Sequence, residues 1–336
     1  ISEFAGYGQL SRVDLEQSRR GERVAADEYE KGDVRDFALW KAAKPEDAEV
    51  GAVWETPWGP GRPGWHVECS AMSMHELGET FDIHGGGVDL IFPHHEDEIA
   101  QSEGATGKPF ARYWLHGEFL QIEGEKMAKS TGNIFTLQEL VERGALPSAI
   151  RYTFLTAHYR SKLNFTWEAI ASSAEAVRRL HATRERLRAH PASAHARPDD
   201  RPRLQQAAAR ALGDFTAAMD DDLNTSVALS ALWAFAREIN TRLDELEPLP
   251  ITEAEARSAL DALERIDSVL GILHLAEREQ ELGDDLADWV QEKIEERIAA
   301  RRNRDFARAD AIRHELADRG VVLEDTPTGT RWKRST

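Results

Sequence analysis

Residues 64–107, GWHVECSAMSMHELGETFDIHGGGVDLIFPHHEDEIAQSEGATG, decide the fold of the first third of the chain. The run FDIHGGG predicts a short apolar strand that ends in three glycines, which let a ligand approach the backbone closely. Pro93 suits the first turn of a following helix, and HHEDEIAQSE continues it until Gly104 and Gly107 stop it. The stretch therefore predicts a strand, a glycine-rich bend and a helix in direct succession.

Two potential metal ligands lie on this helix. His94 and Glu98 are four residues apart, so both side chains leave the same face. Cys69, the only cysteine of the 336 residues, could complete a site with them. A thiolate, an imidazole and a carboxylate favour zinc over magnesium or calcium, and three ligands with one open position are typical of catalytic zinc. By spacing alone, a buried thiol beside a helical His–Glu pair explains the same residues, because lone cysteines are often core residues.

The composition bounds the class of protein. With 41% hydrophobic and 30% charged residues, a globular protein of two or three domains is expected. The net charge of −18 argues against a chain that grips nucleic acid by overall charge, so any RNA contact must use local patches. One cysteine excludes an intrachain disulfide, and no apolar run approaches the ~18–20 residues of a membrane span. We therefore expect a cytoplasmic protein without membrane contact.

The opening stretch resembles the cysteinyl-tRNA synthetases, a family of class I aminoacyl-tRNA synthetases. The segments that carry the resemblance are WHVECS (65–70), DIHGGG (82–87) and FPHHE (92–96) with Glu98. The resemblance implies that one zinc per chain is bound by Cys69, His94 and Glu98, and that the thiolate of the substrate L-cysteine adds to the same metal. Zinc takes a thiolate far better than a hydroxyl, so the metal separates cysteine from serine without editing.

The same resemblance assigns residues to the amino acid and its adenylate. Trp65 is expected to line the cysteine pocket. The residues expected near the adenylate are His84, Gly87, Asp89 and Lys129.

A lysine pair follows in the segment Lys126-Met-Ala-Lys129-Ser, downstream of the zinc helix. A solvated turn explains such a pair by itself. Its position, however, matches the family's Lys-Met-Ser-Lys-Ser loop, with Ala128 in place of the usual serine. The resemblance implies that ATP, supplied with magnesium, is activated with the help of Lys126 and Lys129. The two lysines stabilise the charge that develops as pyrophosphate leaves.

Beyond this loop the pattern becomes helical, because Leu, Ala, Ile and Trp recur at spacings of three and four. Helical segments are expected within 136–190 and over 203–219, 223–246 and 252–273. Thr166 is a plausible N-cap, and Thr252 with Glu255 has the spacing of a capping box. These helices predict an antiparallel bundle.

The acidic segment 276–284 is expected to be a linker to a last unit. That unit is predicted to contain two helices within 285–319 and a C-terminal hairpin that turns at TPTG. Five arginines form a basic stripe there: Arg297, Arg301, Arg302, Arg304 and Arg308. A solvated helix face explains the stripe, but beside Trp332 and Lys333 it can contact phosphates and bases of RNA.

The last unit resembles the family's small C-terminal domain, which reads the anticodon of tRNA. By position, its base-contacting residues match Arg301, Asp310 and Asp325.

The resemblance implies an α/β fold class with a partial class I Rossmann-type catalytic domain, followed by an all-α helical bundle and a small mixed α/β C-terminal domain. The chain is expected to return to the sheet at Trp65. Five parts are expected: the end of a catalytic-domain insertion (1–60), the second half of the Rossmann-type domain with the zinc site (61–109), a stem-contact region with the KMAKS loop (110–165), a helical anticodon-binding bundle (166–275) and a C-terminal anticodon-recognition domain (285–336).

The 336 residues lack the family's His-Ile-Gly-His-type nucleotide signature and its upstream zinc cysteine. We therefore expect a fragment without the N-terminal part of the catalytic domain. The expected function is that of a monomeric cysteine–tRNA ligase, which forms cysteinyl-adenylate from cysteine and ATP and transfers the cysteinyl group to tRNA(Cys).

Two alternatives remain open. The cysteine ligase of mycothiol synthesis shares the zinc site and the adenylation step but joins cysteine to an amino sugar. The basic helix and the hairpin tail speak against it, because that enzyme reads no tRNA. A truncated tRNA-binding module without activity is the second alternative.

Overall fold

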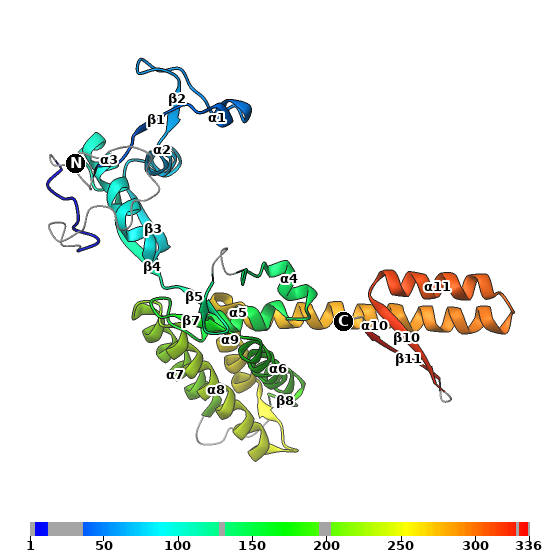
Figure 1. The fold of residues 1–336 in the computed structure, drawn as a ribbon. Helices are drawn as coiled ribbons and strands as arrows, with labels where there is room; N and C mark the ends of the chain where they lie inside the picture. Colours follow the sequence, from blue (N-terminus) through cyan, green and yellow to red (C-terminus); the bar gives the residue numbers. More distant parts are fainter. Residues whose placement is uncertain (1–3, 13–35, 128–131, 195–202, 327–328, 335–336) are drawn as a thin grey trace. The chain divides into compact units, whose positions relative to one another are not determined.

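The computed structural model describes residues 4–12, 36–127, 132–194, 203–326 and 329–334 (Figure 1). It divides into two compact units, residues 1–119 with 159–161, and residues 120–158 with 162–336. Among the described residues, every helix is too short or too polar to cross a membrane.

The first unit is built around a pair of parallel strands. Its elements are β1 (Trp40–Ala42), α1 (Pro45–Glu49), β2 (Gly61–Pro63), α2 (Trp65–Leu77), β3 (Phe81–Gly87), the 3-10 turn η1 (Val88–Leu90), the π-turn η2 (Ile91–His95), α3 (Glu96–Thr106) and β4 (Ala111–Gly117). Phe81 of β3 lies opposite Ala111 of β4, and Gly87 lies opposite Gly117. Because α3 connects these parallel strands, the two strands and the helix form a βαβ unit, which α2 extends by packing on α3.

Two predictions for this unit are confirmed and one is wrong. The strand at FDIHGGG is present, and so is a helix after it, which begins at Glu96 instead of Pro93 and passes through Gly104. It ends at Gly107, whose φ of 71° is a left-handed position that favours glycine. The expected return to a sheet at Trp65 is wrong, since Trp65 is the first residue of α2. The segment WHVECSAMSMHEL contains two Met, two Glu, one Ala and one Leu, all of which favour helix.

The second unit contains a small sheet, a helical bundle and a C-terminal hairpin. Its elements are β5 (Leu120–Ile122), β6 (Glu125–Lys126), α4 (Leu137–Glu142), α5 (Pro147–Leu155), β7 (Leu163–Phe165), α6 (Trp167–Ala189), β8 (Ala192–Ser193), α7 (Arg203–Asp220), α8 (Thr225–Leu246), β9 (Ile251–Thr252), α9 (Glu253–Leu270), α10 (Ile272–Arg302), α11 (Phe306–Asp318), β10 (Val321–Thr326) and β11 (Gly329–Arg334). In the sheet, β5 pairs antiparallel with β6 and parallel with β7.

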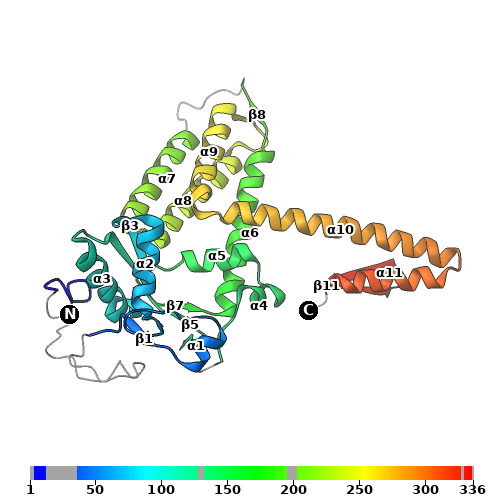
Figure 2. The same ribbon diagram turned by 90° about the horizontal axis from the view of Figure 1, so that it is seen from above.

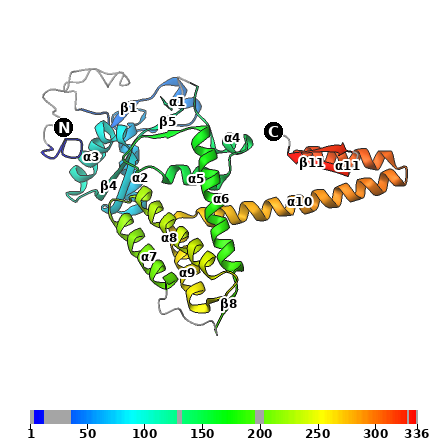
Figure 3. The same cartoon turned by 90° about the horizontal axis from the view of Figure 1, so that it is seen from below.

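The bundle is formed by α6, α7, α8 and α9, whose packing is visible from two further sides in Figures 2 and 3. Its core contains buried Leu, Ile, Phe and Ala residues of all four helices. The two predicted N-caps are confirmed: the hydroxyl of Thr166 accepts a hydrogen bond from the amide of Ala169, and that of Thr252 accepts one from the amide of Glu255. The predicted helical bundle is therefore present.

The predicted linker at 276–284 is wrong, because α10 runs through it without a break. Its residues are mostly Glu, Gln, Leu and Arg, which favour helix, and the single Gly283 costs only about 1 kcal/mol. Tertiary contacts add to this preference. The carboxylate of Glu279 accepts hydrogen bonds from the amide and the hydroxyl of Ser148 in α5, at 2.7 and 2.6 Å.

The C-terminal end of the second unit packs against the second half of α10. The side chains of Val290 and Ile294 are buried against Ile312 and Leu316 of α11. The predicted hairpin is confirmed, since β10 and β11 pair antiparallel with Val321 opposite Arg334. The two central residues of its predicted turn TPTG, Pro327 and Thr328, lie outside the described residues.

Candidate active site

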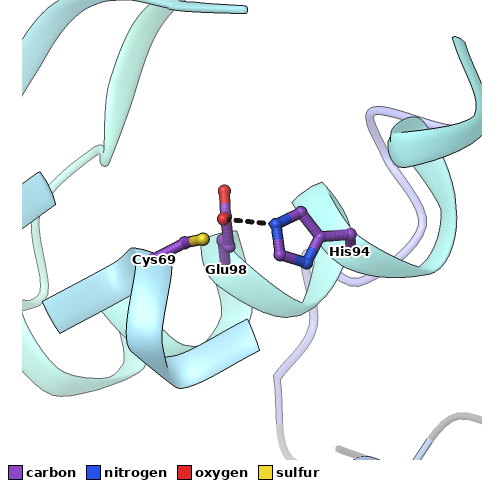
Figure 4. Close-up of side chains that lie close together, drawn as sticks. All are labelled: Cys69, His94 and Glu98. Atoms are coloured by element: carbon purple, nitrogen blue, oxygen red, sulfur yellow. Dashed lines mark ion pairs between the residues drawn. The ribbon is translucent and has the colours of Figure 1, made fainter. Parts of the chain in front are cut away.

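Three potential metal ligands meet in the first unit, as predicted from the sequence. Cys69 comes from α2, His94 from the turn η2 and Glu98 from the first turn of α3 (Figure 4). Their ligand atoms all lie within 4.8 Å of one another. Zinc ligands lie about 2.0–2.3 Å from the metal, so tetrahedral donor atoms are about 3.3–3.8 Å apart. The three side chains are therefore close to the spacing that a zinc ion requires.

Glu98 is at the centre of the cluster and is completely buried. Its Oε1 lies 2.9 Å from Nε2 of His94, and its Oε2 lies 2.8 Å from Nε2 of His84. Burial alone would raise the pKa of Glu98, but the two imidazoles outweigh it and lower that pKa to about 2. Among the described residues, neither oxygen has a partner in a hydrogen bond of regular geometry, so the carboxylate retains capacity to bind a cation.

Cys69 has the opposite electrostatic environment. Burial and the negative charge of Glu98 raise the pKa of its thiol. A divalent cation reverses this effect, because a metal-bound thiol is deprotonated. A soft sulfur, an imidazole nitrogen and a carboxylate oxygen make a donor set that fits zinc.

A second group of possible ligands shares Glu98. The ligand atoms of His84, His95 and Glu98 also lie within 4.8 Å of one another. His95 is held from its other side by His116, with 2.8 Å between Nδ1 and Nε2. Burial lowers the pKa of His95 to about 4, so its imidazole is neutral at pH 7. Two imidazoles and a carboxylate also suit zinc, and the group with Cys69 differs by offering a thiolate, the softer donor.

Of the other residues predicted for the amino acid and adenylate, Trp65 and His84 contact this cluster. The ring of Trp65 stacks on His94, with 4.4 Å between ring centroids, yet 56% of Trp65 is exposed and available to a ligand. His84 contacts Glu98, with 2.8 Å between Nε2 and Oε2. Gly87 ends β3 and Asp89 is exposed in the turn η1.

Several polar residues of this site were not predicted from the sequence. His66 contacts His94, and Asp97 contacts His66. Glu96 accepts hydrogen bonds from the amides of Gly8 and Ser11, at 2.9 and 2.6 Å. The one available signal was the run of three acidic residues after HH in the first turn of a helix, because three adjacent buried acids each need a partner.

The predicted ATP-binding lysines can be placed only in part. The backbone of Lys126 ends β6, where it pairs with Gln121. The side chain of Lys126 and the whole of Lys129 lie outside the described residues. Next to them, Met127 packs on the core of Ile122, Ala149 and Phe165 in the second unit.

The predicted anticodon residues lie in the C-terminal part of the second unit. Arg301 is in the last turn of α10 and Asp310 is on α11, and both are exposed. Asp325 lies in β10, opposite Thr330 of β11. The side chain of Asp325 lies outside the described residues.

The basic stripe is less continuous than the sequence suggested. Arg297 is buried. Arg308 forms ion pairs with Glu296 and Glu315, at 2.5 and 3.1 Å, which neutralise its charge. The exposed arginines at the junction of α10 and α11 are Arg301, Arg302 and Arg304.

Family models match three parts of the chain. Residues 1–175 match the class I (C) tRNA synthetase catalytic domain, residues 214–274 the DALR domain, and residues 275–332 the cysteinyl-tRNA ligase anticodon-binding domain. Among solved structures, the LeuRS of Agrobacterium radiobacter K84, crystallised in a ternary complex with tRNA and LeuAMS, has a similar fold. Its TM-score is 0.50 at 14% identity, over 71% of this chain and 35% of that one. Together with the βαβ unit and the helical bundle, these matches define a class I aminoacyl-tRNA synthetase fold and confirm the predicted fold class.

Curated relatives identify the particular synthetase. The chain is 45% identical to the cysteine–tRNA ligase of Solibacter usitatus over 99% of this chain and 69% of that protein. It is 46% identical to the cysteine–tRNA ligase of Desulforudis audaxviator, over 100% of this chain and 70% of the relative. The chain belongs to the cysteine–tRNA ligase family. The predicted family and enzyme class, an aminoacyl-tRNA ligase that uses ATP, are confirmed.

Proposed function

We propose that this ligase selects its amino acid at a zinc ion held by Cys69, His94 and Glu98. The observation that carries the proposal is the convergence of the three ligand atoms within 4.8 Å of one another. The buried carboxylate oxygens of Glu98, which lack regular hydrogen bonds, support it as well. When bound there, zinc supplies a soft Lewis acid that takes a thiolate in preference to a hydroxyl.

The side chains around the cluster prepare it for cysteine. Cys69 and Glu98 contribute the negative charge that holds a divalent cation, while His94 contributes a neutral nitrogen donor. Trp65, stacked on His94 and half exposed, covers one side of the cluster and limits the size of the amino acid. Selection thus rests on coordination, because an apolar pocket alone separates isosteres by only ~1–3 kcal/mol.

The adenylate and the triphosphate are assigned to other residues. We propose that His84, Gly87 and Asp89 contact the adenylate, since they lie on β3 or in the turn directly after it, and His84 contacts Glu98 of the cluster. Lys126 and Lys129 stabilise the charge on the leaving pyrophosphate of ATP, which arrives with magnesium. This step is positioning and electrostatics, without a covalent enzyme intermediate.

The C-terminal part is assigned to the anticodon. We propose that Arg301, Asp310 and Asp325 contact the anticodon bases of tRNA(Cys). The match of residues 275–332 to an anticodon-binding domain supports this assignment. It also favours tRNA over the amino sugar of mycothiol synthesis as the acceptor. We also propose the predicted boundaries at 60, 109 and 165, whereas the helix α10 excludes a break at 276–284. The monomeric state and the cytoplasmic location are proposals as well, and sedimentation tests the monomer.

Metal binding and amino acid selectivity test the site directly. We expect the purified chain to bind one zinc, and Cys69→Ser to lose most of it, while His75→Ala, at an exposed histidine of the same helix, retains it. With cobalt in place of zinc, cysteine should strengthen the thiolate-to-metal absorption and serine should leave it unchanged. A Cys69→Ser variant with full zinc content would contradict the proposed ligand set.

The catalytic assignment needs a separate measurement. ATP–pyrophosphate exchange that depends on cysteine and is lost in Cys69→Ser would show that these 336 residues activate the amino acid. Zinc binding and tRNA binding without exchange would instead support a tRNA-binding module.

A further inference from the structure

A row of polar contacts connects the cluster of Cys69, His94 and Glu98 to the N-terminal segment, residues 4–12. Nδ1 of His66 lies 2.7 Å from Nδ1 of His94. On the opposite side of its ring, Nε2 of His66 lies 3.3 Å from Oδ2 of Asp97. The other oxygen of Asp97 accepts a hydrogen bond of 2.5 Å from the hydroxyl of Tyr7. These four side chains come from the segment 4–12, α2, η2 and α3.

The chemistry of imidazole sets the direction of these hydrogen bonds. A neutral histidine has one nitrogen that donates and one that accepts. The Nε2 atom of His94 points at Glu98, so a metal ligand there needs the lone pair on Nε2 and the hydrogen on Nδ1. His94 then donates to Nδ1 of His66, which must accept. His66 consequently carries its own hydrogen on Nε2, where Asp97, an acceptor when ionised, can receive it.

Burial raises the free-energy cost of any other arrangement of these hydrogens. Asp97 is 1% exposed, and the side chain of His66 is 15% exposed. In such surroundings a mismatched donor pair is costly, because water cannot replace the lost partner. If His66 carried its hydrogen on Nδ1, that hydrogen would meet the hydrogen of His94.

We infer that His66, oriented by Asp97, is a positioning residue that fixes the ring and tautomer of His94 with the Nε2 lone pair turned toward Cys69 and Glu98. This inference rests on the proposed zinc site. Groups that hold the second nitrogen of a metal-ligating histidine typically change metal affinity by about 10–100-fold when they are removed.

The three consecutive acids at the start of α3 contact different groups. Glu96 accepts hydrogen bonds from the amides of Gly8 and Ser11. Asp97 orients His66, and Glu98 contacts His94. The three consecutive carboxylates therefore have three different partners, and only the last is a proposed ligand.

Two substitutions of similar polarity separate the two contacts of His66. In His66→Asn, the amide oxygen can lie near the former Nδ1 and still accept from His94, while the contact with Asp97 is lost. In His66→Gln, the amide lies near the former Nε2 and keeps Asp97 but does not reach His94. Zinc affinity is measured by competition with a chromogenic chelator, and the cobalt spectrum reports the ligand geometry. Circular dichroism checks that each variant folds.

We expect His66→Gln to bind zinc about 10–100-fold more weakly than the parent chain. His66→Asn should recover most of that affinity and the parent cobalt spectrum. His75→Gln, at an exposed histidine of α2, should bind zinc as the parent does. Equal zinc affinity of the Asn and Gln variants would overturn the inference.

A parallel measurement on Cys69→Ser distinguishes this inference from the proposed site. If Cys69→Ser keeps its zinc, the proposed ligand set fails and the positioning role fails with it. If Cys69→Ser loses zinc while His66→Gln retains it fully, only the positioning role is overturned.

Discussion

At the scale of single residues, Gly86 lies where a side chain would overlap the site. A Cβ atom there would stand 2.8 Å from Cε1 of His95 and 2.9 Å from Cδ1 of Leu90. At the adjacent Gly85, a Cβ atom would come no closer than 3.6 Å to its nearest neighbour, the carbonyl of Leu115. Only the second glycine is therefore required by the packing around His95.

We predict that Gly86→Ala lowers the free energy of unfolding of the first unit by about 1–3 kcal/mol, because His95 must move to relieve the overlap. Chemical denaturation measures this difference, with Gly85→Ala as the matched control. The control should change stability by no more than about 0.5 kcal/mol. Equal losses in the two variants would show that the contact with His95 is not the cause.

At the scale of elements, α10 shows how tertiary contacts and helix preference act together. Gly283 lies within this helix, and a Cβ atom there would meet no other atom within 4 Å. We predict that Gly283→Ala raises the free energy of unfolding of the second unit by about 0.5–1 kcal/mol, since alanine loses less backbone entropy in a helix. Denaturation followed by circular dichroism measures the change.

The control for this prediction is Gly213→Ala in α7, where a Cβ atom also has no neighbour within 4 Å. Both substitutions should stabilise the chain by similar amounts. Stabilisation by Gly213→Ala alone would indicate that residues 276–284 form a linker in solution after all.

At the scale of the whole molecule, a chain of net charge −18 binds an anionic tRNA, so attraction must come from local groups. We predict that Arg301→Ala weakens binding of tRNA(Cys) by about 1–3 kcal/mol if its guanidinium reads an anticodon base. Filter binding at fixed salt measures the affinity. Arg278→Ala is the control, because this exposed arginine lies on the same helix about 35 Å away at 1.5 Å per residue.

The two substitutions should differ in specificity as well as in affinity. Loss of Arg301 should reduce the preference for the cognate anticodon, and Arg278→Ala should leave it unchanged. A uniform loss with every tRNA would assign Arg301 to a phosphate instead of a base.

Local patterns predicted much of the fold and part of the site. The spacing of His94 and Glu98 predicted that their side chains lie together, which they do although His94 is in the turn η2 and Glu98 in α3. Apolar periodicity identified the bundle helices. Residues 276–284 were misread as a linker because acidic residues and a glycine occur in loops and in solvated helices alike. The contact between Glu279 and Ser148 joins residues 131 positions apart, and no local pattern contains it.

The sequence by itself determined the family, the strand–bend–helix order of residues 64–107 and the donor types that suit zinc. Each of these follows from residue identity and from spacing along the chain. Only the tertiary structure decided that His66 and Asp97 lie behind His94, and that Glu98 contacts His84 as well as His94. The physical reason is that hydrogen-bond partners on separate elements are chosen by packing, which periodicity within one element does not specify.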